Sequence, residues 1–195
     1  MNLDITRCVS TRVHIKEILV LCGLPCAGKT TWVQEYICHH DGVALIERDV
    51  VIAEMSRDAE LLLRVEEQVK TIVTPISKLY SSRDANARND IFTQEYVTRV
   101  SKLIHECSAQ VCIVDGLHAQ RISREFIRSF ENIKRRAVYI STPASVCAAR
   151  FDNESSIAKK RRTQLSPRMI FRLAEIFEPP TIDEGFDSVI SCDSF

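Results

Sequence analysis

The sequence predicts an α/β fold: a doubly wound parallel sheet of about five strands with helices on both faces. Two observations lead to this prediction. Short, almost continuously apolar runs alternate with segments in which apolar residues recur at helical spacing, and such runs are typical of strands buried on both faces. A glycine-rich turn also joins the first apolar run directly to a helix. A length of 195 residues suits one domain, so we expect a single domain over residues 1–195.

The first quarter of the chain supplies two strands and one helix. The apolar run Ile18–Cys22 predicts the first strand, and a helix is expected from Lys29 to about His39. Asp41-Gly42 indicates a turn, after which Val43–Ile46 predicts a second strand that ends at Glu47-Arg48-Asp49.

Residues 50–110 contain no strand signal and form a predicted helical segment. Apolar residues recur there at helical spacing, at Leu61, Leu62, Val65, Val69, Ile72 and Val73. A further helix is expected from about Ile91 to His105, and the polar residues Arg83 to Asp90 indicate the turn between the two.

The second half of the chain continues the alternation. It predicts a strand at Val111–Gly116, a helix at Arg121–Phe130, a strand at Ala137–Ile140, a helix at Ala144–Phe151, a last helix to about Phe177 and a strand at Val189–Ser191. Ser166-Pro167 is typical of the start of that last helix, with serine as N-cap and proline in the first turn.

A phosphate-binding loop follows the first strand. Gly23-x4-Gly28-Lys29-Thr30 matches the pattern of a P-loop NTPase at every fixed position, between a strand and a helix. The two glycines let backbone N–H groups point at phosphate oxygens, Lys29 reaches the β- and γ-phosphates, and the Thr30 hydroxyl can bind Mg²⁺. We therefore expect ATP with Mg²⁺ to bind at Gly23, Pro25, Ala27, Gly28, Lys29, Thr30 and Thr31.

Polar residues follow the other strands, and in an open parallel sheet they meet at the ligand site. Asp49 can accept the proton of an attacking hydroxyl, or it can cap the next helix. Arg48 can bind substrate or form a structural ion pair. Asp115 ends the third strand and can hold Mg²⁺ or simply end the strand. His118 can contact substrate, although a loop histidine is more often exposed or hydrogen-bonded.

A basic segment at about residues 150–165 is expected to form a lid. Arg150 lies at the end of a predicted helix, where its guanidinium can close over the transferring phosphoryl group. Lys159, Lys160, Arg161 and Arg162 follow it. This run can guide a polyanion, or it can be a solvated loop or a nuclear-import-like patch.

Composition narrows the setting. The 26 basic and 26 acidic side chains cancel, so a polyanionic substrate must be held by a local patch. Residues 1–16, an N-terminal extension, lack the apolar centre of a signal peptide, and no apolar run approaches the ~20 residues of a membrane span. The eight cysteines are scattered and contain no C-x2-C pair. Reduced cysteines and a cytoplasmic or nuclear location, with no membrane partner, are therefore expected.

Together these segments resemble the kinase module of the polynucleotide 5′-hydroxyl kinases. The loop Gly23–Trp32 is similar to that family's Gly-x-Pro-Gly-x-Gly-Lys-Ser-Thr-aromatic loop, and Glu47-Arg48-Asp49 is similar to its Asn-Arg-Asp. The apolar strand Val111–Asp115 matches a strand that ends in Asp-Thr-Asn. Phe177–Phe186 looks like the animal enzymes' Phe-Glu-x-Pro-x-x-x-Glu-Gly-Phe. The resemblance implies ATP and Mg²⁺ as cofactors, Lys29, Asp49 and Arg150 as catalytic residues with Asp49 the general base, and a nucleic acid 5′-hydroxyl end as partner.

The chain departs from that family on the acceptor side. Gly116 and Leu117 replace the Thr-Asn of the Asp-Thr-Asn motif, and Ile52 stands where the phage enzyme has an arginine that binds the substrate phosphate. Two alternatives therefore stay open: a P-loop kinase of a small molecule or a tRNA-linked acceptor, and a nucleotide-switched binding protein.

Overall fold

The computed structural model describes residues 15–72, 81–154 and 165–193, and its centre is a parallel five-stranded sheet in the order β2-β3-β1-β4-β5. The strands are β1 (Glu17–Cys22), β2 (Val43–Glu47), β3 (Val111–Asp115), β4 (Lys134–Ile140) and β5 (Ser188–Cys192). The central strand β1 pairs with β3 on one side and with β4 on the other. The predicted α/β fold with a parallel sheet is confirmed.

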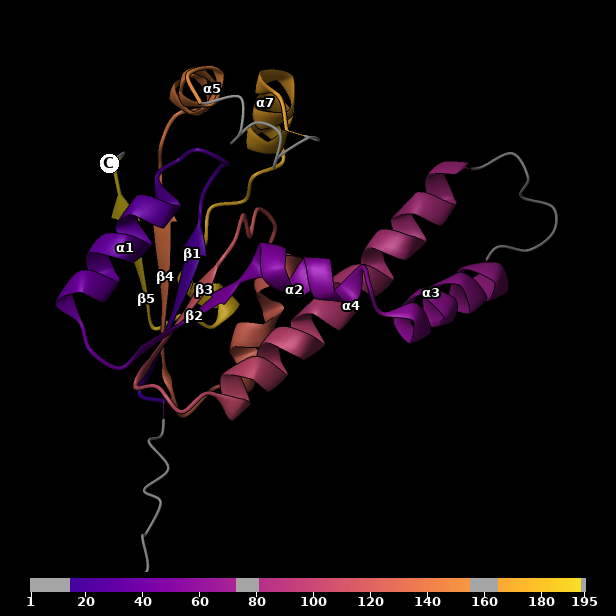
Figure 1. Ribbon diagram of the computed structural model, residues 1–195, viewed down its shortest axis with the longest axis horizontal. Coiled ribbons are helices and arrows are strands. Elements are labelled where there is room, and N and C mark those ends of the chain that lie inside the picture. Colours follow the sequence, from indigo (N-terminus) through magenta and orange to yellow (C-terminus); the bar gives the residue numbers. More distant parts are fainter. Residues whose placement is uncertain (1–14, 73–80, 155–164, 194–195) are drawn as a thin grey trace, which may run out of the picture.

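Two apolar clusters cover the two faces of the sheet. In β1, Ile18, Val20 and Cys22 belong to one cluster, whereas Leu19 and Leu21 belong to the other. Successive strand residues point to opposite faces, so a continuous apolar run is what a strand between two helical layers needs. Helices α2 (Arg48–Met55) and α4 (Ser81–Glu106) contribute to the first cluster. Helices α1 (Lys29–His39), α5 (Ala144–Asp152) and α7 (Pro167–Glu175) contribute to the second (Figure 1).

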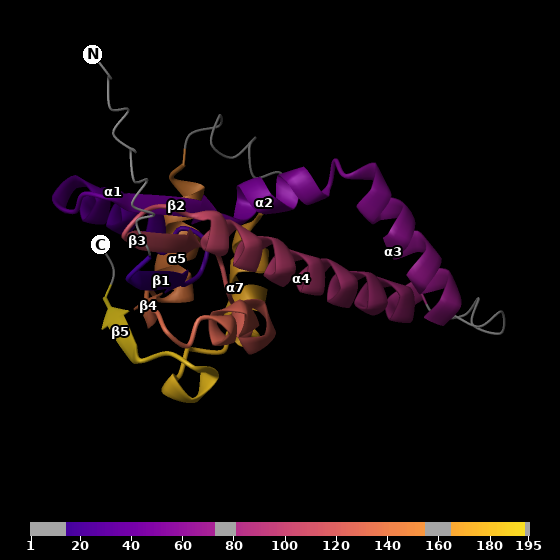
Figure 2. The ribbon, with the colours of Figure 1, turned by 90° about the horizontal axis from the view of Figure 1, so that it is seen from below.

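Where the structure describes residues 48–106 they form helices, apart from a short turn at residues 56–58, but the predicted turn from Arg83 to Asp90 is wrong. Helix α4 begins at Ser81 and continues through those residues to Glu106. Its C-terminal part packs on the sheet through Tyr96, Val100 and Ile104. Its N-terminal part and helix α3 (Ala59–Ile72) extend away from the sheet as an arm, which both views show (Figures 1 and 2).

Two elements differ from their predicted form. Residues Arg121–Ser129 form a 3₁₀ helix, η2, rather than an α-helix. Arg124, Ile127 and Phe130 are all buried, and this spacing of three matches the three residues per turn of a 3₁₀ helix. Strand β4 begins at Lys134 because its first residues pair with β1, where Arg136 forms an ion pair with Glu17. Ser166 caps α7 as predicted, since its side chain accepts a hydrogen bond from the Met169 N–H.

The C-terminal tail is fastened to the loop after β3 by a buried ion pair. The Arg124 guanidinium donates two hydrogen bonds to Glu184, at 2.7 and 2.8 Å, and a third to the His118 carbonyl at 2.6 Å. Both side chains are almost fully buried, and Phe186 lies in the core beside them. Removing one partner of such a pair leaves an uncompensated buried charge. The tail therefore holds the loop in place.

Of the helices in the described residues, none combines the length and apolarity needed to cross a bilayer.

Candidate active site

A cleft of about 1010 Å³ lies at the carboxyl ends of the strands. It gathers the expected residues of the phosphate loop with those that follow β2, β3 and β4. Its lining consists of Pro25, Cys26, Ala27, Gly28, Lys29, Thr30, Thr31, Glu47, Arg48, Asp49, Asp115, Gly116, Leu117, Arg150, Glu154, Leu165 and Met169. Most of the residues predicted to bind nucleotide or substrate therefore share one site. Lys159–Arg162 lie outside the described residues.

The backbone of the phosphate loop depends on its two glycines. A Cβ at Gly23 would stand 2.9 Å from the carbonyl oxygen of Ile140, so no side chain fits there. Gly28 caps α1 in the left-handed conformation, with φ of 109°. The Lys29 ammonium donates to the carbonyls of Gly23 and Leu24, both at 2.9 Å, and so lies within the curl of the loop.

Two side chains, one from the segment after β4 and one from helix α5, bind backbone carbonyls of this loop. Thr142, after β4, donates to the Ala27 carbonyl at 2.7 Å. Arg150, in the last turn of α5, places Nη1 at 3.1 Å from the same carbonyl and at 3.4 Å from that of Cys26. The guanidinium therefore stands at the phosphate loop.

Asp115 and Lys29 are coupled across the cleft. Burial raises the pKa of the Asp115 carboxyl, and the Lys29 ammonium opposes that rise. Burial likewise lowers the pKa of Lys29, and Asp115 opposes that change. Oδ1 of Asp115 is buried and has no hydrogen-bond partner in the part of the chain that the structure describes. A buried carboxylate oxygen in need of a partner, with the exposed Thr30 on the same cleft, fits the oxygen ligands that Mg²⁺ prefers.

Arg48 and Asp49 are the first two residues of α2, directly after β2. The N-cap of α2 is Glu47, so the alternative in which Asp49 caps this helix is wrong. The Asp49 side chain lines the cleft and is fully exposed, and its carboxylate forms an ion pair with Arg48 Nη1 at 3.9 Å. The Arg48 guanidinium lies over the ring of Tyr96, with Cζ 5.6 Å from the ring centroid.

His118 does not reach the cleft. Only 1% of the residue is exposed, Nδ1 lies 2.7 Å from the Leu21 carbonyl, and Nε2 lies 2.8 Å from the Tyr96 hydroxyl. The carbonyl can only accept, so Nδ1 donates to it and Nε2 accepts from Tyr96. The expectation that His118 contacts substrate is wrong for this structure, because both ring nitrogens bond to the protein itself.

Burial lowers the pKa of His118 to about 3, from 6.5. The unfolded chain binds a proton that the folded protein excludes, so the free energy of unfolding is expected to fall as the pH falls from about 6.5 toward 3. The contribution of His118 to the slope of the free energy of unfolding against pH approaches about 1.4 kcal/mol per pH unit.

Urea unfolding of the wild type and of His118→Gln at about pH 7.5 and pH 5.5 measures this contribution. The difference in free energy of unfolding between the two proteins is expected to shrink at the lower pH. At pH 5.5 the unfolded wild-type chain binds a proton at His118, which the folded protein does not, whereas the glutamine of the variant binds no proton in either state. An equal difference at both pH values would contradict the prediction.

The sequence predicts no role for several residues that lie at or behind the cleft. Glu47, Leu117, Leu165 and Met169 line it, and Tyr96 lies behind Arg48. Glu47 and Leu117 adjoin motif residues, which is the one signal that could have marked them. Tyr96 comes from the middle of a long helix, and its helical spacing indicates only burial.

Comparison with known families agrees with this geometry. A family model described as AAA domain matches residues 18–166, which is more than half of the chain. The chain belongs to this family. The region shared with the AAA domain family includes the phosphate loop, Arg48-Asp49, Asp115 and Arg150, whereas the Phe177–Phe186 tail lies beyond it. No curated protein matches the chain by sequence.

Solved structures with TM-scores above 0.5 show the same fold at low identity. A gluconokinase from Sinorhizobium meliloti 1021 is 16% identical, with a TM-score of 0.51, over 93% of this chain and 84% of its own. TT1252 from Thermus thermophilus is 13% identical, with a TM-score of 0.54, over 92% and 89%. A chain of the Pnkp1/Rnl/Hen1 RNA repair complex is 17% identical, with a TM-score of 0.48, over 86% and 45%. The fold is that of the P-loop kinases.

Proposed function

We propose that this protein is an ATP-dependent phosphotransferase that moves the γ-phosphoryl group to a hydroxyl group. The observation that carries the proposal is the exposed Asp49 carboxylate in the same cleft as the phosphate loop and Lys29. Phosphoryl transfer requires both a cation at the β- and γ-phosphates and a group that accepts the proton of the attacking hydroxyl.

Each group has a distinct task in this proposal. The loop N–H groups and Lys29 bind the phosphates, Asp49 accepts the proton from the acceptor, and Arg150 offsets charge on the transferring group. Thr30 and Asp115 would hold Mg²⁺, which supplies positive charge beside the β- and γ-phosphate oxygens. The nucleotide-switched binding protein is less favoured, because a switch needs no exposed base for an acceptor.

The 5′-hydroxyl end of DNA or RNA is the first candidate acceptor. Its support is the resemblance of Arg48-Asp49 and of the Phe177–Phe186 tail to the polynucleotide kinases. The tail supports the resemblance through packing: Glu184 and Phe186 are buried, and no residue from Phe177 to Phe186 is among those that line the described cleft. The tail motif therefore supports a relationship to the polynucleotide kinases, but it does not support contact with nucleic acid.

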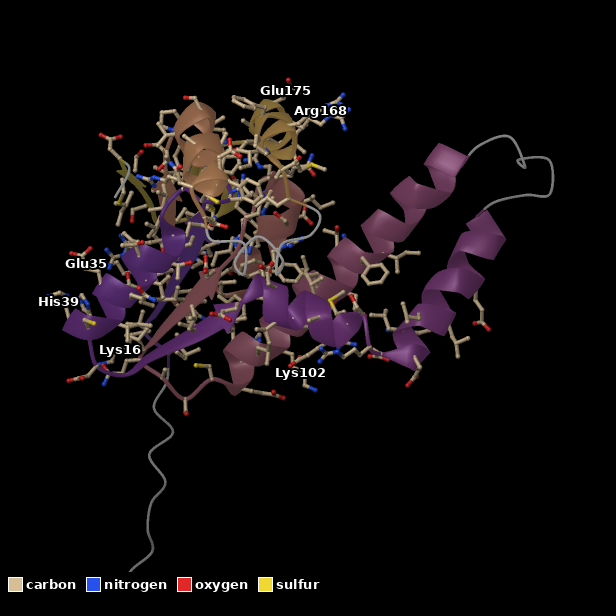
Figure 3. The ribbon with its side chains drawn as sticks, turned by 45° about the horizontal axis from the view of Figure 1, so that its top comes forward. Lys16, Glu35, His39, Lys102, Arg168 and Glu175 are labelled. Carbon is tan, nitrogen blue, oxygen red and sulfur yellow. The ribbon has the colours of Figure 1, made fainter. Side chains whose placement is uncertain are left out.

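A small hydroxyl compound is the second candidate, favoured by the charge of the cleft. Glu47 and Asp115 are register partners at the ends of β2 and β3, and Asp49 lies beside them. Among the described residues, the cleft lining holds four carboxylates, these three and Glu154, against the three cations Lys29, Arg48 and Arg150. Lys29 and Arg150 bind carbonyls of the phosphate loop, so Arg48 is the described cation of the lining that lies away from the loop. Arg168 and Lys102 are surface residues (Figure 3) and do not line the cleft. Acidic surroundings disfavour an acceptor whose hydroxyl is next to a phosphate.

A transfer assay with γ-labelled ATP tests the function and separates the candidates. The panel contains 5′-hydroxyl DNA, 5′-hydroxyl RNA, nucleoside 3′-phosphates and uncharged polyols. A 5′-phosphorylated oligonucleotide serves as the control that lacks the acceptor hydroxyl. Label in an oligonucleotide but not in its 5′-phosphorylated control supports the first candidate, and label only in a small compound supports the second. ATP binding with no transfer to any acceptor would contradict the proposed function.

Replacing Arg150 tests its role at the transferring phosphate. Arg150→Ala is expected to lower kcat by ~10²-fold, the lower end of what one preorganised donor contributes. Arg172→Ala, which changes an exposed arginine in the last turn of α7, is the matched control. Steady-state kinetics measure both variants. A kcat for Arg150→Ala equal to that of the control would assign Arg150 a structural role at the Ala27 carbonyl instead.

A further inference from the structure

The Arg48 guanidinium is held from behind by a residue of the long helix α4. Its Cζ lies 5.6 Å from the centroid of the Tyr96 ring, and the side chain is 35% exposed, whereas that of Asp49 is fully exposed. A cation over the face of an aromatic ring is attracted by the ring's negative face. Arg48 therefore has a preferred place, on the cleft side of α4.

The Tyr96 ring is itself fixed at its far end. It is 2% exposed, its hydroxyl donates to His118 Nε2 at 2.8 Å, and His118 Nδ1 donates to the Leu21 carbonyl at 2.7 Å. The chain of contacts thus runs from Arg48 to the backbone of the central strand β1. Hydrogen bonds in a buried chain of this kind rigidify its members.

Gly116 provides the space in which Arg48 lies. A Cβ there would stand 2.9 Å from Arg48 Cβ and 2.9 Å from His118 Cε1. The first contact is with the root of the arginine side chain, and the second is with a ring bonded at both nitrogens. Neither can yield easily. The absence of a side chain at residue 116, a departure from the polynucleotide kinases, is therefore what lets Arg48 reach the Tyr96 ring.

We propose that Tyr96, Gly116 and His118 form a positioning unit that fixes the Arg48 guanidinium beside Asp49, at the acceptor side of the cleft. The inference rests on the proposed function for what Arg48 binds, but not for how Arg48 is held. The unit acts through Arg48. It places the N–H donors of Arg48 next to the position of the acceptor hydroxyl, whose proton Asp49 takes.

Kinetics of Tyr96 variants test the unit. Tyr96→Leu removes the ring face and is expected to raise KM for the acceptor about tenfold, with KM for ATP changed less than about twofold. Tyr96→Phe keeps the face but loses the hydroxyl, so its effect is expected to be intermediate. Phe130→Leu is the matched control, since Phe130 is a buried aromatic of the same apolar cluster that packs against His105. It is expected to lower the melting temperature without changing KM for the acceptor.

A double variant shows whether Tyr96 acts through Arg48. If it does, Arg48→Ala combined with Tyr96→Leu has the same KM for the acceptor as Arg48→Ala alone. Additive effects in the double variant, or an equal rise of both Michaelis constants in Tyr96→Leu, would overturn the inference.

A chemical readout separates this inference from the proposed function. Phenylglyoxal modifies accessible guanidinium groups, and peptide mass spectrometry gives the rate at Arg48 whether or not the protein transfers phosphate. Arg48 is expected to react several-fold faster in Tyr96→Leu and in Gly116→Ala than in the wild type or in Phe130→Leu. If phenylglyoxal reacts faster with Arg48 in these two variants but the protein phosphorylates no acceptor, the positioning unit is supported and the proposed phosphotransferase activity is rejected. Equal rates in all four proteins would reject the unit, whatever the activity.

Discussion

Lys29→Ala is expected to reduce phosphoryl transfer by ~10³-fold, because it removes the cation that reaches the β- and γ-phosphates. In the structure the Lys29 ammonium donates to the carbonyls of Gly23 and Leu24, so it already lies inside the loop where those phosphates would bind. The affinity for ATP is expected to fall as well. Loss of the ammonium also removes the charge that opposes the raised pKa of Asp115.

Calorimetric titration with ATP and single-turnover transfer measure the two effects of Lys29→Ala. Lys16→Ala is the matched control, since Lys16 is an exposed lysine that precedes β1, at the opposite end of the strand from the loop (Figure 3). Circular dichroism checks that both variants keep the fold. A folded Lys29→Ala protein that transfers phosphate as fast as Lys16→Ala would show that this loop is not the ATP site.

Asp49→Asn is expected to lower kcat by ~10²-fold or more, the usual contribution of a general base. Asparagine keeps the shape of the side chain but cannot take the proton of the acceptor hydroxyl. The affinity for ATP is expected to stay nearly constant, because Asp49 is exposed in the cleft and is not part of the phosphate loop.

The control for Asp49→Asn uses the other end of the same strand. Asp41 is an exposed aspartate that precedes β2, whereas Asp49 follows it. Asp41→Asn is therefore expected to leave kcat and KM unchanged. Weakened ATP binding in Asp49→Asn with an unchanged rate of the chemical step would assign Asp49 to the nucleotide site and remove it as the base.

The sheet and the phosphate loop could be predicted because their sequence signals have local causes. Continuous apolar runs mark strands covered on both faces. The glycines of the loop stand where the backbone needs them, since a Cβ at Gly23 would lie only 2.9 Å from the Ile140 carbonyl oxygen. The start of α4 could not be predicted in the same way. Apolar spacing reports a buried face rather than helicity, and the N-terminal part of α4 extends beyond the sheet (Figure 1).

The roles of polar residues were harder to predict because contact depends on the fold. His118 follows a cleft residue in the sequence by one position, yet its ring turns inward to Leu21 and Tyr96. Glu184 belongs to the segment that resembles the polynucleotide kinases, yet its carboxylate accepts hydrogen bonds from the buried Arg124. Sequence likeness reveals which residues accompany a fold, but it does not separate those that pack from those that touch a ligand.

The placement of Arg48 at the start of α2 has a consequence for the base beside it. Consecutive residues of a helix project about 100° apart, so when the Arg48 side chain lies on the Tyr96 ring, the Cα–Cβ bond of Asp49 has a set direction and only its side-chain torsions remain free. Asp49 is thereby directed into the cleft, although its side chain is fully exposed. Under the proposed function, other residues that line the cleft, such as Glu47 and Leu117, can be exchanged, in evolution or by design, without moving the base.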